Sequence, residues 1–156
     1  MRPTQEVITA LLTVAQVHQQ RVEAALAHLQ PHLPLSAQQL IAADYEVIAS
    51  AELLISRFGK LQDHLGAKLV PLVVNLSEEP LPANATFVDK LNCLERLRAL
   101  PDVATFRRLR EVRNDLAHDY PDDPEQAAAS LAVVVASVPA LLAAHQALRA
   151  AVGRYQ

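Results

Sequence analysis

The residues best suited to chemistry stand close together near the end of one stretch, residues 103–120. Arg113 and Asn114 are followed by His118 and Tyr120. A guanidinium group matches the geometry of phosphate oxygens, and an imidazole exchanges protons near neutral pH. This combination is suited to binding a polyanion and moving protons on it.

Each of these residues also has a purely structural explanation. Arg113 can form an ion pair with Glu111 or Asp115, and His118 can stabilise the C-terminal end of a helix. Six of the 14 lysines and arginines lie between residues 96 and 113, and such a cluster is often only a solvated helix face. The residue types alone leave both interpretations open.

A helix over about residues 102–118 must position these side chains. Arg113 falls at the edge of its apolar stripe, where a guanidinium needs a partner because its desolvation is expensive. The stripe has four members at helical spacing: Phe106, Leu109, Val112 and Leu116. A second face carries polar residues: Arg107, Glu111, Asn114 and His118.

The spacing of Arg113 and His118 limits how they act together. They are five residues apart, which is about 140° around a helix axis. Both side chains therefore reach one small ligand only if the helix ends near His118, or if two copies of the chain meet across a symmetric interface.

Apolar periodicity and capping residues predict the other elements. Together with residues 102–118 they give an antiparallel bundle of about five helices, in a single all-α domain over residues 1–156. The four other helices are expected from Thr4 to about Gln30, from Ser36 to between Val70 and Leu76, from Thr86 to Leu97 or Leu100 before Pro101, and from Asp123 to about Gly153.

Several features are expected within these helices. The first carries apolar residues near a 3.6-residue period: Val7, Leu11, Val14, Val17, Ala24 and Leu29. Gly59 and Gly66, two small residues seven apart, allow a close contact with another helix. Pro71 and Pro139 are expected to kink or bend their helices. Asp44 and Asp63 lie on the second helix and are candidates to approach the site around Arg113.

Composition supports this fold class. Hydrophobic residues make up 51% of the chain, and it has 3 Gly and no Trp, which disfavours sandwiches and barrels. The single cysteine excludes an internal disulfide and a cysteine-based zinc site, and we expect no metal and no cofactor. It also fits a cytoplasmic location. The net charge of −3 gives no general sign of nucleic-acid binding, which would depend on the local arginines.

The final helix needs a check for membrane insertion. Residues 126–148 contain no Asp, Glu, Lys or Arg, a length that approaches a membrane span. The stretch consists mostly of alanine with small and β-branched residues, and alanine contributes little transfer free energy. We therefore expect a helix buried in a bundle or dimer, and no membrane.

The string RNDLAHDYP over residues 113–121 resembles the signature of the HEPN superfamily, and more narrowly of its HepT-like branch: Arg, Asn, three residues, His, any residue, Tyr. Two upstream strings, RFGKLQDHLG at 57–66 and FVDKLN at 87–92, also resemble HepT-like sequence. The resemblance covers roughly residues 36–155.

The resemblance implies a helical homodimer whose two motifs meet in a cleft, and a metal-independent ribonuclease. The chain would be the toxin of a toxin–antitoxin module. Its partner would be a minimal nucleotidyltransferase, which silences the toxin by transferring AMP to a tyrosine that corresponds to Tyr120.

This resemblance also implies roles for individual residues. His118 would act as general acid or base, and Arg113 would stabilise the charge on the reacting phosphate. Asn114 would orient His118 or a phosphate oxygen. Arg107 and Arg110 are expected to contact RNA, with transfer RNA as one candidate. Two alternatives stay open: a non-catalytic subunit that binds nucleotide for a nucleotidyltransferase, and a helical dimer with a scaffolding role only.

Overall fold

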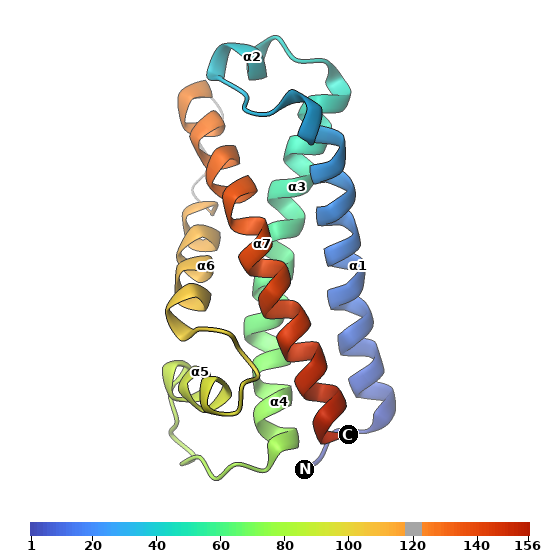
Figure 1. Cartoon of the computed structure of the whole chain (residues 1–156), viewed down its shortest axis with the longest axis vertical. Helices are drawn as coiled ribbons and strands as arrows, with labels where there is room; N and C mark the ends of the chain where they lie inside the picture. The colour runs from blue at the N-terminus through green and yellow to red at the C-terminus, as the bar shows by residue number, and fades with distance from the viewer. Residues whose placement is uncertain (118–122) are drawn as a thin grey trace.

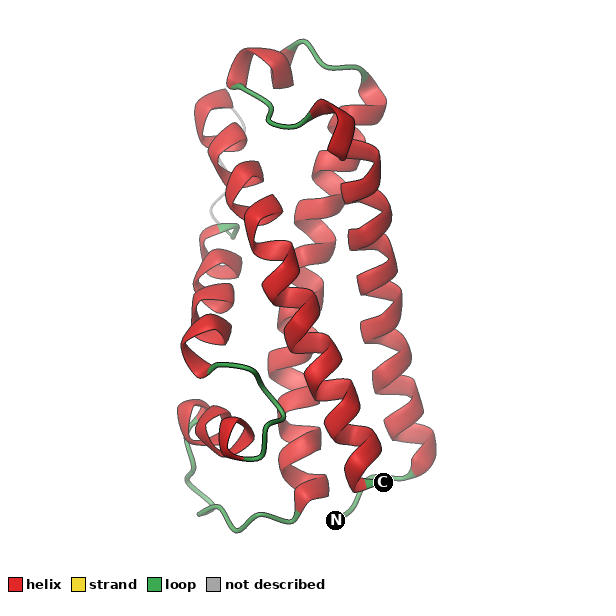
Figure 2. Ribbon diagram, in the orientation of Figure 1, coloured by secondary structure: helices red, strands yellow, loops and turns green. Residues whose placement is uncertain are grey.

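The structure is a computed structural model, and it describes residues 1–117 and 123–156. All regular structure within these two ranges is helical, and they contain no strand. Figure 2 shows the helices joined by loops. The predicted all-α class is therefore confirmed.

Three long helical segments lie side by side along the molecule (Figure 1). They are α1 (Gln5–Leu29), the continuous segment of α3 (Tyr45–His64) and α4 (Val70–Ser77), and α7 (Pro124–Tyr155). A π-helical stretch, Leu65–Leu69, joins α3 to α4. The remaining elements are short: a 3₁₀ turn (Gln30–His32), α2 (Ala37–Ile41), α5 (Phe87–Arg96) and α6 (Val103–Asp115).

The predicted helix starts are confirmed. The Ser36 hydroxyl accepts from the backbone N–H of Gln39 (3.1 Å), and the Gln39 side chain accepts from the backbone N–H of Ser36 (2.9 Å). Thr86 and Asp89 form the same reciprocal capping box at α5. Asp123 caps α7 through the backbone N–H of Gln126 (3.1 Å). These short-range hydrogen bonds satisfy N–H groups that have no partner within the helix.

The single long helix predicted from Ser36 is wrong, because the chain breaks between α2 and α3. Ala42 ends α2, and Asp44 adopts an extended backbone (φ −64°, ψ 156°) as the N-cap of α3. Aspartate is among the residues most favoured at this position. The helical spacing across residues 40–47 concealed the break, and the number of helices rises accordingly.

Pro71 does not end its helix. The π-helical stretch lies directly before it, and the backbone N–H of Val70 bonds to the carbonyl of Leu65, five residues back. A proline lacks an N–H and its ring crowds the preceding turn, so a wider turn accommodates it. The helix then continues to Ser77.

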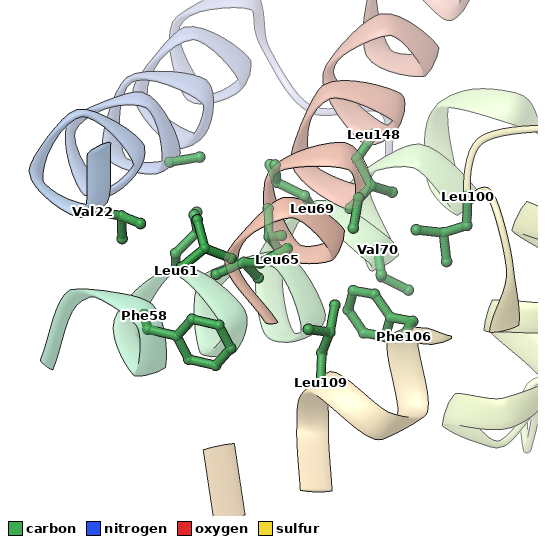
Figure 3. Packing of buried hydrophobic residues seen from close by; sticks show 14 of the residues in the cluster. Val22, Phe58, Leu61, Leu65, Leu69, Val70, Leu100, Phe106, Leu109 and Leu148 are labelled. Carbon is green, nitrogen blue, oxygen red and sulfur yellow. The ribbon is translucent and has the colours of Figure 1, made fainter. Parts of the chain in front are cut away.

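The core lies between the three long segments and α6, and Figure 3 shows Phe58, Leu65 and Phe106 among its members. The stripe predicted for α1 is right for Leu29, which is buried, and for Leu11, which packs against the core, and wrong for Val7, Val14 and Val17. Val7 and Val14 are 47% and 42% exposed, whereas the buried positions include Ile8, Ala15, Val22 and Leu29. Helix α1 carries two neighbouring apolar stripes, and contact with α3 and α7 buries only one of them.

Helix α7 is long and apolar enough to cross a membrane by length and composition. In its most apolar window, 33% of the residues are buried inside the molecule. The buried residues of α7 include Leu131, Val134, Val138, Leu141 and Leu148.

Candidate functional site

Helix α6 is fixed in place at its first turn. The Asp102 carboxylate accepts hydrogen bonds from the Thr105 hydroxyl (2.6 Å) and the backbone N–H of Ala104 (3.1 Å). These bonds, chiefly the one from Thr105, hold the pKa of Asp102 below its usual value. The backbone N–H of Val103 donates to the Glu95 carboxylate (2.9 Å), which ties α6 to α5.

The predicted stripe of α6 faces the core. Phe106 and Leu109 are buried, and Val112 and Leu116 pack against them while partly exposed. The outward face therefore carries the polar residues of the predicted site. Its exposed members include Arg107, Arg110 and Asn114.

Arg113 has a partner, as its position requires, but not one on its own helix. Its Nε and Nη2 atoms lie 3.0 Å and 2.9 Å from Oδ2 of Asp63 on α3. The Arg113 side chain is 31% exposed and that of Asp63 is 53% exposed. Of the structural explanations that the sequence leaves open, an ion pair is therefore correct, but its partner is Asp63 on the facing helix rather than Glu111 or Asp115.

Gly59 provides the space in which Arg113 lies. A Cβ atom at Gly59 would stand 2.9 Å from Cδ and 3.0 Å from Nε of Arg113. Only a glycine permits this approach without moving the arginine. The predicted close helix contact is confirmed here, between α3 and α6.

Two shallow grooves flank Arg110, whose Cζ atom lies 4.6 Å from the centre of the Phe87 ring. The first, here called the Asn114 groove, has a volume of about 200 Å³. It is lined by Phe87, Val88, Arg107, Arg110, Glu111 and Asn114. It gathers the predicted RNA-contacting arginines and the supporting asparagine on one surface between α5 and α6.

The second, here called the Gln62 groove, lies on the α3 side of Arg110 and has a volume of about 290 Å³. It is lined by Gln62, Asp63, Gly66, Ala67, Phe87 and Arg110. The sequence pattern did not indicate a binding role for Gln62 or Phe87. Gln62 could have been noticed, because it is a polar residue four positions after the core residue Phe58, on a helix face that is otherwise buried.

His118 and Tyr120, the predicted general acid–base and the predicted modification site, lie outside the described residues. Asp44 caps the opposite end of α3, 19 residues before Asp63. At a rise of about 1.5 Å per residue this is about 28 Å away, so Asp44 does not belong to the site.

The described part of the site is suited to binding anions. Nε of Arg113 donates to Asp63 and Nη2 lies at ion-pair distance from the same oxygen. A guanidinium has five N–H donors, more than one carboxylate oxygen engages, so it can contact a phosphate oxygen as well. Arg107 and Arg110 are exposed nearby. In the described ranges, no group of three or more His, Cys, Asp or Glu residues is arranged to hold a metal ion.

A separate polar pair lies inside the core, away from this face. His145 is 1% exposed and its Nδ1 atom bonds to the Gln19 side chain, while Nε2 has no partner among the described residues. Burial, with smaller effects from the nearby cation of Arg149, lowers the pKa of His145 to about 4. The folded protein therefore holds this imidazole neutral, and protonation in the unfolded chain opposes folding below about pH 6.5.

Comparison with protein-family models, with curated proteins and with solved structures finds no match for this chain.

Proposed function

We propose that this chain is a metal-independent HEPN-type ribonuclease in which Arg113 and His118 act on one phosphate of RNA. The observation that carries the proposal is the placement of Arg113. Its guanidinium is held by Asp63 over Gly59, beside a groove that presents Arg107, Arg110 and Asn114. A guanidinium with free N–H groups and a fixed orientation is suited to charge that develops on phosphate.

The proposed chemistry needs no metal. The ribose 2′-hydroxyl gives its proton to a His118 imidazole, and the 2′-oxygen attacks the adjacent phosphorus. The 5′-oxygen of the next nucleotide leaves and takes a proton from an imidazolium. The products are a 2′,3′-cyclic phosphate and a 5′-hydroxyl. Arg113 stabilises the added negative charge in the transition state, and Asn114 orients the phosphate or the histidine.

The proposal includes an antiparallel helical bundle that pairs as a homodimer, so that one cleft receives two histidines. The outward face of α7 supports this pairing. Residues 126–148 carry no charge, and exposed small or apolar residues, including Ala132, Val133 and Ala136, continue along the helix. Burying such a face against a second copy removes apolar surface from water.

Control by a partner completes the proposal. A minimal nucleotidyltransferase antitoxin would attach AMP to Tyr120, two residues after His118. The added phosphate charge and nucleoside would block the substrate backbone. As such a toxin, the chain would act in the cytoplasm on RNA, possess no cofactor and not enter a membrane.

The Arg113–Asp63 pair favours a second candidate, a non-catalytic subunit that binds nucleotide for a nucleotidyltransferase. The carboxylate offsets the charge of the arginine that the first proposal makes catalytic. In this candidate the same face binds nucleotide or the partner and cleaves nothing.

One experiment separates the two candidates. Purified protein, shown by mass spectrometry to carry no AMP, is incubated with a transfer-RNA pool in EDTA. Arg113→Ala and His118→Ala are compared with Arg108→Ala, which changes an exposed arginine on α6 that donates a hydrogen bond to the Thr105 hydroxyl (3.3 Å). The ribonuclease proposal expects cleavage by the parent and by Arg108→Ala only. Cleavage retained by both site variants refutes it, and no cleavage by any protein favours the second candidate.

A further inference from the structure

A polar side chain lies at the wall of the Gln62 groove. Gln62 is 3% exposed overall and lines the groove, and its amide atoms are not among the buried, unpartnered atoms of the described residues. Its Nε2 atom lies 3.9 Å from where a Cβ of Gly66 would stand, and both residues line the groove. The amide is therefore at the wall of the groove, within reach of a ligand.

A glutamine amide at the wall of a groove presents one carbonyl oxygen and two N–H donors, so a ligand that offers both a donor and an acceptor pairs with it. The groove therefore selects for a ligand with a mixed hydrogen-bonding edge.

The rest of the lining selects for a flat ligand. The Arg110 guanidinium lies over one face of the Phe87 ring, with 4.6 Å between Cζ and the ring centre. Both groups are planar, and an aromatic ring stacks on such a group where the groove leaves it uncovered. Gly66 and Ala67 add almost no side chain, and they belong to the π-helical stretch that widens the helix here. Stretches of this kind occur often at functional sites.

Charge fixes which part of a ligand enters. Asp63 lines the groove and repels phosphate, whereas Arg107 and Arg110 line the neighbouring Asn114 groove. A nucleotide is therefore oriented with its base in the Gln62 groove and its phosphate toward the arginines. Asp63 also accepts a hydrogen bond from an N–H of the base.

We propose that the Gln62 groove binds one unpaired nucleobase of the RNA substrate, through the Gln62 amide and the Phe87 ring. This inference rests on the proposed ribonuclease function and adds a preference for single strands. All four bases present a mixed donor and acceptor edge when unpaired, and a duplex uses that edge in base pairing.

The test measures binding to an RNA that is not cleaved. Fluorescence anisotropy of the whole protein is recorded with a short labelled oligonucleotide carrying 2′-O-methyl groups, as a single strand and as a duplex. Gln62→Leu removes the amide. Gly66→Ala adds a methyl group at 3.6–3.9 Å from its neighbours, an ordinary contact that fills the groove without forcing them apart. Gly153→Ala, with no atom within 4 Å, is the matched control.

The parent is expected to bind the single strand more tightly than the duplex. Gln62→Leu and Gly66→Ala should each weaken single-strand binding by about tenfold and leave duplex binding unchanged, since base contacts of this kind discriminate to that extent. Gly153→Ala should bind as the parent does. Thermal unfolding of each variant shows that it is folded.

Three results would contradict the proposal that the groove binds a nucleobase of RNA. Unchanged single-strand binding by folded Gln62→Leu overturns it. If the variants lose the same affinity for the single strand and for the duplex, the proposal is wrong, because the groove then contacts the sugar–phosphate backbone. If AMP alone binds as tightly as the oligonucleotide, the ligand of the groove is a free nucleotide and not RNA. Since this RNA has no free 2′-hydroxyl, single-strand preference without any cleavage of natural RNA refutes the ribonuclease proposal alone.

Discussion

Replacing Gly59 by alanine tests whether Arg113 must lie against α3. The added Cβ would stand 2.9 Å from Cδ and 3.0 Å from Nε of Arg113. Nonbonded heavy atoms prefer about 3.5–4.0 Å, so the arginine must move outward by about 0.5–1 Å. This movement lengthens or breaks its two contacts with Asp63.

The effect on stability is expected to be small and the effect on activity large. Alanine is favoured over glycine in a helix by about 1 kcal/mol, and a partly exposed ion pair contributes at most about 1 kcal/mol. The two changes offset each other. A catalytic group displaced by about 1 Å, in contrast, costs on the order of 100-fold in rate.

The assay is kcat/KM for RNA cleavage, with thermal unfolding measured on the same preparations. Gly153→Ala is the control, because it makes the same exchange near the end of α7 where no atom lies within 4 Å. Folded Gly59→Ala that cleaves RNA at the parent rate, and whose Arg113 Nε–H resonance is unmoved, refutes the argument that this contact sets the site.

Three further perturbations have defined outcomes. Asp63→Asn removes the charge opposite Arg113, so RNA binding should tighten while kcat falls about tenfold; an unchanged kcat would remove Asp63 from the site. Because the pKa of His145 is near 4 in the folded protein, the parent should lose about 2 kcal/mol of unfolding free energy between pH 7 and pH 5. Urea titrations of His145→Gln should show a clearly smaller loss, and an equal loss would contradict this. Val133→Glu places a charge on the exposed α7 face, and light scattering should then find a monomer with an unchanged unfolding temperature.

Local signals predicted the ends of the helices well. The capping pairs at Ser36 and Thr86 and the Asp123–Pro124 start depend on hydrogen bonds within one turn, so a few neighbouring residues decide them. The sequence did not predict the break before Asp44, because the helical spacing of residues continues across it. A continuous pattern is compatible with one helix or with two, and only packing decides between them.

The choice of buried face could not be predicted for α1. Its two apolar stripes, one through Val7 and one through Ile8, are one residue apart, and either satisfies the helical period. Contact with α3 and α7 selects the second stripe. For α6 the prediction succeeded, because Phe106 and Leu109 form its only stripe with large side chains and arginines occupy the opposite side.

For the site, the sequence indicated that Arg113 needs a partner but not which one. The candidates on its own helix were visible from spacing, whereas Asp63 is 50 residues away in the sequence. Such a partner follows only from how α3 and α6 pack. Gly59 was the indirect signal, since a small residue four positions before Asp63 marks the face of α3 on which another chain segment lies close.

The positions of Gly59, Asp63 and Gly66 explain why one helix serves two purposes. They are four and three residues apart and so share one face of α3 and its π-helical continuation. Gly59 admits Arg113, Gly66 opens the Gln62 groove, and the Asp63 carboxylate both binds the arginine and lines that groove. A change at Asp63 should therefore alter cleavage and single-strand preference together, whereas Gln62→Leu should alter only the preference. If the Asp63 and Gln62 variants change cleavage and single-strand preference in the same way, the Asp63 carboxylate does not act both on Arg113 and in the Gln62 groove.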